Sequence, residues 1–258
     1  MRRFTIAPDR IEGGRVIFDR DESRHIARVL RLRAGDTVLA ADGTGCDYTV
    51  RLETVGDTAT GTVLGVAPRA AESPLRLTLV QSVPKGDKME LIVRATTELG
   101  VARVVPVLTE RTIVVLEPGR WRERARRWQR VAKEASKQCG RAVIPAVDTP
   151  RPLVDYLALD EPADLKLCVW EAAAHEGEHG GPPRSLGTTL AARLPPMLPP
   201  EARVHLLVGP EGGLARREVE AAGARGWLVV GIGPRILRTE TAGAALVAIL
   251  QSKFGDMH

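Results

Sequence analysis

The sequence predicts an α/β protein in which a small β-rich domain precedes a larger domain built on a largely parallel sheet. Its 258 residues, 44% apolar and 27% charged, have the composition of an ordinary globular protein that can bury a sizeable core. Short strands separated by Gly and Asp turns fill about the first 70 residues. After them, strands alternate with helices, which is the pattern of an α/β domain.

Residues 1–72 are predicted to form a small β-barrel. Turn sequences such as Asp42-Gly43-Thr44-Gly45 separate short β-branched and apolar runs. One short helix is expected between the strands, with Ser23 as its N-cap and Gly35 as its stop. The strands are expected at residues 16–18, 37–40, 48–52 and 62–64, and the stretch 67–74 is interpreted as a linker.

Residues 73–258 are predicted to form the second domain, with both faces of its sheet covered by helices. Strands are expected at 75–83, 103–108, 165–170, 204–208 and 227–232. Helices are expected at 87–99, 118–139, 153–159, 215–225 and 241–254. Residues 172–200 are rich in Gly, Pro and Ala, and we interpret them as an irregular insertion.

Several classes of protein are disfavoured. No apolar run reaches the roughly 18 residues that a membrane span needs, and the N-terminus lacks the apolar region of a signal peptide, so a cytoplasmic protein is expected. Cys46, Cys139 and Cys168 are odd in number and far apart, which fits neither a disulfide framework nor a metal knuckle.

The segment His175-Glu176-Gly177-Glu178-His179 matches the zinc-protease pattern H-E-x-x-H. That chemistry needs a helix that places both histidines on one face. Gly177 and the Gly-Gly-Pro-Pro run that follows oppose a helix, so a polar loop and no metal site are expected.

Positive charge gathers on the predicted helix 118–139. Nine basic and two acidic residues lie between positions 120 and 141, around an apolar stripe of Trp121, Ala125, Trp128, Ala132, Ala135 and Cys139. A basic face suits a phosphate backbone, although a solvated arginine-rich face is the alternative interpretation. A second basic cluster lies in the first domain. The candidate nucleic-acid-binding residues are Arg24, Arg28, Arg31, Arg33, Arg126, Arg130, Lys133, Lys137 and Arg141.

Two glycine-bearing turns follow predicted strands near the C-terminus. The first is Gly209-Pro210-Glu211-Gly212-Gly213, and the second begins at Gly231-Ile232-Gly233. Neither has the spacing of a phosphate-binding loop or a dinucleotide fingerprint. Because the carboxyl ends of parallel strands form the ligand edge of such sheets, a nucleoside-like ligand is expected there. The alternative is that the glycines serve turn geometry alone.

The same turns carry a family resemblance. Gly209–Gly213, followed by Gly233-Pro234-Arg235-Ile236-Leu237-Arg238-Thr239-Glu240-Thr241-Ala242, resembles the signature of the ribosomal RNA small subunit methyltransferase E family. Further matches are residues 25–33, 85–90, 97–101, 109–111 and 134–141, so the resemblance covers nearly the whole chain. One departure is Arg94-Ala95, where such enzymes often carry Gln-Lys.

The resemblance implies an N-terminal PUA-like RNA-binding barrel and a C-terminal SPOUT-type domain with a trefoil knot, against the usual rule that chains are unknotted. It also implies a homodimer that uses S-adenosylmethionine to methylate N3 of a uridine in the decoding region of 16S rRNA, in the 30S subunit. Carried over by motif, nine residues should line the cofactor pocket, largely through backbone groups: Leu207, Gly209, Ile232, Gly233, Arg235, Leu237, Arg238, Thr239 and Thr241.

Uracil N3 carries a proton, so the reaction needs a group that removes it or stabilises the resulting anion. We hypothesise that Arg238 polarises a uracil oxygen or a nearby phosphate and that Glu240 accepts the proton. Alternatively, Glu240 only pairs with Arg235 or Arg238 to hold the turn. Two rival functions are methylation of transfer RNA by a related knotted enzyme and a non-catalytic role in RNA binding or ribosome assembly.

Overall fold

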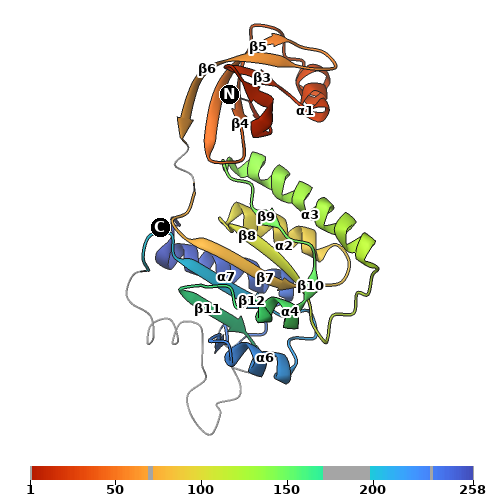
Figure 1. Ribbon diagram of the computed structural model, residues 1–258, viewed down its shortest axis with the longest axis vertical. Helices are drawn as coiled ribbons and strands as arrows, with labels where there is room; N and C mark the ends of the chain where they lie inside the picture. The colour runs from red at the N-terminus through yellow and green to blue at the C-terminus, as the bar shows by residue number, and fades with distance from the viewer. Residues whose placement is uncertain (1, 69–71, 171–197, 233–234, 258) are drawn as a thin grey trace. The chain divides into compact units, whose positions relative to one another are not determined.

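The computed structural model describes residues 2–68, 72–170, 198–232 and 235–257 (Figure 1). The chain divides into two compact units. One comprises residues 1–72 with 134–144, and the other comprises 73–133 with 145–258. The histidine pair 175–179, Gly233 and almost all of the segment 172–200 fall outside the described residues.

The first unit is built on a six-stranded sheet. Its strands follow the order β1 (Arg3–Thr5), β4 (Thr37–Ala41), β5 (Cys46–Thr54), β6 (Thr60–Pro68), β3 (Arg15–Ile17) and β2 (Ile11–Glu12). Only β1 and β4 pair in parallel; the other neighbours are antiparallel. The order is open, with β1 and β2 at its ends. The core of this sheet contains the fully buried Phe4, Phe18, Ile26 and Val50.

The predicted helix of this unit begins four residues earlier than the sequence analysis placed it, so Ser23 as the N-cap is wrong. Asp19 precedes α1 (Arg20–Arg24) and its side chain accepts a hydrogen bond from the Glu22 backbone N–H at 2.8 Å. Ser23 is buried instead, and its hydroxyl accepts from the Ala59 backbone N–H at 2.8 Å. A π-helical turn, His25–Val29, continues α1, and a 3-10 turn covers Pro8–Arg10.

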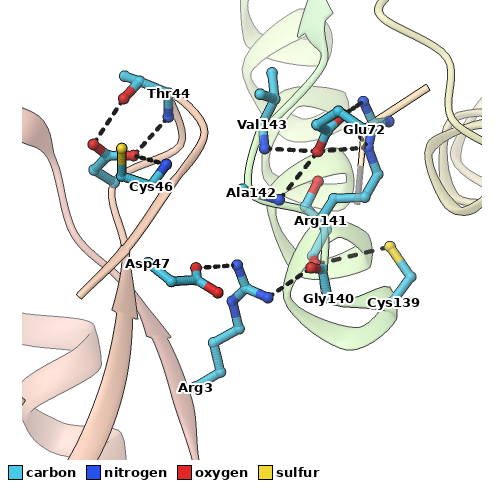
Figure 2. Close-up of polar contacts among 12 residues, drawn as sticks. Arg3, Thr44, Cys46, Asp47, Glu72, Cys139, Gly140, Arg141, Ala142 and Val143 are labelled. Carbon is cyan, nitrogen blue, oxygen red and sulfur yellow. Dashed lines mark hydrogen bonds and ion pairs between the residues drawn. The ribbon is translucent and has the colours of Figure 1, made fainter. Parts of the chain in front are cut away.

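Residues 134–144, the end of the long helix and its continuation, belong to the first unit through polar contacts (Figure 2). The Arg3 guanidinium donates to the Asp47 carboxylate at 2.5 Å and to the Gly140 carbonyl at 2.6 Å. The Glu72 carboxylate accepts from the Arg141 guanidinium at 2.7 Å and from the backbone N–H groups of the next two residues. These bonds hold the segment against β1 and β5 of the same unit.

The second unit contains a wholly parallel sheet, as the alternating pattern predicts. Its order is β10 (Arg151–Pro152), β8 (Arg103–Leu108), β7 (Arg76–Ser82), β12 (Arg203–Val208), β11 (Leu165–Val169) and β13 (Leu228–Val230), and β9 (Ala146–Val147) also pairs with β8. All the carboxyl ends of the strands therefore lie at one edge.

Helices cover both faces of this sheet. The helices α2 (Lys88–Glu98) and α7 (Thr239–Phe254) contact each other, and Leu79 of β7 lies beside Gly243 of α7. Side chains alternate along a strand, so Val80 points to the other face. There it packs in a buried cluster with residues of α4 (Leu153–Ala158) and α6 (Arg216–Gly223).

The long helix α3 spans Pro118–Cys139, the bounds that the sequence predicts. The apolar stripe is buried from Trp121 to Ala135, and Cys139 is half-buried. Among the described residues, no helix has both the length and the apolar character that a membrane span requires.

Candidate active site

A cavity of about 340 Å³ lies in the second unit, at the carboxyl ends of β11, β12 and β13. Ligand pockets for small molecules typically enclose roughly 300 to 1,000 Å³. The two glycine-bearing turns meet at this cavity, as the sequence predicts. Its walls comprise Lys88, Val169, Trp170, Val208, Gly209, Pro210, Glu211, Gly213, Ile232, Arg235, Ile236, Leu237, Arg238, Thr239 and Ala242.

A buried hydroxyl joins the first turn to the start of α7. The Thr239 Oγ1 donates to the Gly209 carbonyl at 2.7 Å and accepts from Gln81 Nε2 at 2.9 Å. Gln81 is fully buried at the end of β7. At Gly209 a Cβ would lie 3.0 Å from the Leu214 backbone nitrogen, so any other residue would have to push the tightly folded turn apart by a few tenths of an ångström. The hydrogen bonds of Thr239 tie together the turn after β12, the start of α7 and the end of β7 beside the cavity.

Two loops from other strands support the outer side of the same turn. The Arg111 guanidinium, beyond β8, donates to the Gly212 carbonyl at 2.7 Å. The Lys85 backbone N–H, beyond β7, donates to the Glu211 carboxylate at 3.1 Å. The turn is therefore braced by hydrogen bonds from both neighbouring loops.

Lys88, the first residue of α2, brings two carboxylates to the cavity wall. Its Nζ lies 3.0 Å from Glu211 Oε1 and 3.4 Å from Glu240 Oε2. The hydrogen bond to Glu211 raises the pKa of the Lys88 ammonium. Partial burial opposes ionisation of Glu211, but hydrogen bonds from backbone N–H groups and from Lys88 outweigh it and lower the pKa of that carboxyl. Both groups are charged at neutral pH.

Most of the predicted cofactor residues lie at the cavity. Six line it: Gly209, Ile232, Arg235, Leu237, Arg238 and Thr239. Leu207 is not among the lining residues, and its fully buried side chain packs in the cluster with Val80 on the α4 and α6 face. Thr241 is exposed and is not among the lining residues. Gly233 lies outside the described residues.

Of the two predicted catalytic residues, Arg238 lines the cavity and Glu240 does not. Arg238 is exposed and lines it. Glu240 is half-buried on the first turn of α7, and its fully buried Oε2 has no hydrogen-bond donor among the residues that the structure describes. Among the described residues the ion pair of Glu240 is with Lys88, and not with Arg235 or Arg238 as the alternative interpretation supposed.

The predicted RNA-binding residues fall into two groups. Lys137 and Arg141 pair with acidic side chains of their own unit: Lys137 with the buried Glu22 at 2.5 Å, and Arg141 with Glu72 at 2.7 Å. Lys133 is half-buried. The other six are exposed: Arg24, Arg28, Arg31, Arg33, Arg126 and Arg130.

Sequence reasoning missed the wall residues that lie far from the two turns. Lys88, Val169 and Trp170 precede the turns by at least 39 positions, and only the fold brings them together. A signal for Lys88 was present, since residues 85–90 are among the segments that carry the family resemblance. Within the described parts of the chain, no group of His, Cys, Asp and Glu is arranged to hold a metal ion.

Comparison with known proteins gives two family matches. Residues 71–251 match the family described as the RNA methyltransferase domain, and residues 18–59 match the family described as the RNA methyltransferase PUA domain. The first match covers the cavity and both turns.

Two curated relatives have the same name, and the chain matches each of them over most of its length. The chain is 35% identical to the ribosomal RNA small subunit methyltransferase E of Synechocystis over 95% of this chain and 76% of that protein. It is 30% identical to the Bacillus subtilis protein of the same name, over 86% of this chain and 84% of that protein.

Solved structures agree with these relatives. The ribosomal RNA small subunit methyltransferase E of Neisseria gonorrhoeae, bound to S-adenosylmethionine, is 31% identical, with a TM-score of 0.83 over the full length of both chains. A Legionella pneumophila protein, also with bound S-adenosylmethionine, is 27% identical, with a TM-score of 0.83 over 98% of both chains.

The cavity fits that cofactor. Its apolar wall, which includes Trp170, Ile232 and Leu237, suits an adenine ring, and the backbone of two open turns offers hydrogen bonds for polar edges.

Proposed function

Because this chain belongs to the ribosomal RNA small subunit methyltransferase E family and is a methyltransferase that uses S-adenosylmethionine, we propose that it methylates N3 of a uridine in the decoding region of 16S rRNA. The observation that carries the proposal is the cavity at the two turns. Its wall bears Arg235, Arg238 and Lys88, and Lys88 forms an ion pair with Glu240.

The side chains present suit proton removal from a weakly acidic ring nitrogen. S-adenosylmethionine, when bound, supplies an electrophilic methyl group on a cationic sulfur. Arg238 is exposed at the cavity and can stabilise negative charge on a uracil oxygen. Glu240 carries a carboxylate on the adjacent helical turn and is our candidate for the group that accepts the N3 proton. The chain needs no covalent nucleophile for this reaction, since positioning and electrostatics suffice.

We propose that the exposed arginines bind the RNA backbone. Arg24, Arg28, Arg31 and Arg33 offer positive charge in the first unit; of these Arg28 has only a distant pair, 3.8 Å from the exposed Asp57. Arg126 and Arg130 lie one helical turn apart on α3 in the second unit. Side chains free to move in solvent can each neutralise a phosphate. Lys137 and Arg141 are left out of this surface, because breaking their pairs would leave Glu22 and Glu72 without a cation.

Three features of the family resemblance complete the proposal. The protein acts in the cytoplasm, where its ribosomal substrate is found, and works as a homodimer. The C-terminal segment forms a trefoil knot, as the family resemblance implies.

The substrate test uses small ribosomal subunits from a strain that lacks this enzyme. We expect the purified protein to transfer a labelled methyl group from S-adenosylmethionine to one uridine, which mass spectrometry of nucleosides identifies as N3-methyluridine. Because N3 methylation blocks base pairing, reverse transcription should stop at that uridine. Methylation of a carbon or ribose atom, or of transfer RNA in place of 16S rRNA, would contradict the proposal. If Arg238→Ala keeps full turnover, Arg238 has no role in the mechanism. If the protein is a monomer by size-exclusion chromatography with light scattering, the proposed homodimer is wrong.

A further inference from the structure

One charged cluster at the cavity contains a cation, Lys88, to which the mechanism above gives no role. It consists of Lys88, Glu211 and Glu240, which come from the start of α2, the turn after β12 and the first turn of α7. The first and last of these residues are more than 100 positions apart in the sequence. Lys88 and Glu211 line the cavity, and Glu240, which does not line it, is the second partner of Lys88.

The geometry of the cluster places a single cation between two anions. Glu211 Oε1 and Glu240 Oε2 lie 3.0 and 3.4 Å from the same Lys88 Nζ, so the two oxygens cannot be more than about 6.4 Å apart. The side chain of Lys88 is 33% exposed and that of Glu240 is 19% exposed, so solvent screens this group only in part. Without the ammonium, the two carboxylates would repel each other across the cavity wall.

Glu240 depends on Lys88 more than Glu211 does. The Oε2 atom of Glu240 is fully buried and has no hydrogen-bond donor among the described residues, so the Lys88 ammonium is its compensating charge. Glu211 has a second partner, the Lys85 backbone N–H at 3.1 Å. Two further cations, Arg235 and Arg238, line the cavity, and Arg111 bonds to the Gly212 carbonyl of the same turn.

We propose that Lys88 is a positioning residue: its ammonium holds the Glu211 turn and the start of α7 together, and so sets the width of the cofactor cavity. This role does not depend on which atom of the RNA is methylated or on which residue takes the proton. It assigns to Lys88 a function in cofactor binding that acts through two other side chains.

The first test measures the cluster in the protein without cofactor. The carboxyl carbon of Glu211 is followed by NMR during a pH titration, with Glu211→Gln used for the assignment. We expect Lys88→Met to move the midpoint of this titration to a higher pH, because the strongest cationic partner is lost, and Lys88→Arg to restore most of the shift. Arg94→Met is the matched control, since Arg94 is an exposed cation six residues further along α2. An unchanged midpoint in Lys88→Met would overturn the proposal.

The second test measures affinity for S-adenosylmethionine by calorimetry. We expect Lys88→Met to weaken binding about tenfold, and Lys88→Arg and Arg94→Met to stay within about threefold of the unchanged protein. Adding Glu211→Gln to Lys88→Met should recover part of the affinity, because the repulsion between the two carboxylates is then gone. Equal losses in Lys88→Met and Arg94→Met would show a general charge effect and refute the positioning role. If Lys88→Met does not fold, the double variant Lys88→Met with Glu211→Gln provides the same comparison against Glu211→Gln alone.

Discussion

The shape of the site depends on the hydroxyl of Thr239. It joins the Gly209 carbonyl at 2.7 Å and Gln81 Nε2 at 2.9 Å, and the residue is only 5% exposed. Thr239→Val keeps the shape of the side chain and removes both hydrogen bonds. Gln81 keeps its bond to the Ser82 carbonyl at 3.0 Å, but the Gly209 carbonyl loses this donor. Since an unsatisfied buried group costs about 1 to 3 kcal/mol, we expect a loss near 2 kcal/mol in the free energy of unfolding.

Thr239→Ser is the control for this substitution, because it keeps the hydroxyl and loses only a methyl group, worth about 0.8 kcal/mol. Urea denaturation gives the free energies of unfolding, and calorimetry gives the affinity for S-adenosylmethionine. The Val variant should bind the cofactor about tenfold more weakly, since Gly209 lines the cavity, whereas the Ser variant should bind it nearly normally. If the Val variant is as stable as the Ser variant and binds the cofactor equally well, the hydroxyl does not fix the turn and the reasoning fails.

Three further changes test other parts of the structure. Gly100→Ala should destabilise the protein by roughly 1 to 3 kcal/mol in urea denaturation, because Gly100 has a φ of +87° and a Cβ there would lie 2.4 Å from Gln251 Nε2; no loss of stability would refute both the backbone strain and the clash. Burial lowers the pKa of His205 to about 4 from an ordinary value near 6.5. Between these two values the unfolded chain binds a proton that the folded protein does not, so the free energy of unfolding should fall by at most about 3 kcal/mol as the pH drops from about 6.5 to about 4. Thermal unfolding measured from pH 7 to pH 4 should show a smaller fall in His205→Asn; an equal fall would assign the acid sensitivity elsewhere. Finally, Arg126→Ala with Arg130→Ala should weaken RNA binding and lower the slope of log affinity against log salt by about 2, and an unchanged slope would take α3 out of the RNA surface.

The fold could be predicted from the sequence where one local rule governs a long segment. The bounds of α3 and the parallel sheet follow from clear apolar periodicity and from the alternation of strands with helices. The short α1 was misplaced because Ser23 is a common N-cap type, although Asp19 with Glu22 three residues later was the better match to a capping pattern. The very short strands β1 and β2, of three and two residues, leave almost no periodic signal and were missed.

The site was predictable only as far as the two turns themselves. Each turn is a local motif, and the rule that parallel strands share a carboxyl edge is enough to bring them together. Lys88 also lines the cavity, and its partners Glu211 and Glu240 are more than 120 residues away in the sequence. No rule based on sequence spacing predicts such a contact. Leu207 was included because of its neighbours in the motif, whereas strand alternation turns its side chain to the opposite face.

The positive charge of residues 120–141 shows why a count of charges overstates an RNA surface. Arg127 bonds to Glu90 at 2.6 Å, Lys137 to Glu22 at 2.5 Å and Arg141 to Glu72 at 2.7 Å, so these three cations stabilise the fold. Their partners lie 37 to 115 residues earlier in the chain and cannot be recognised from the helix alone. Arg126 and Arg130 are exposed and have no ion pair within the described part of the chain. Only cations without an internal ion pair can exchange their counterions for phosphates without breaking an internal bond, so the RNA surface that we propose on α3 is narrower than the charge of the helix suggests.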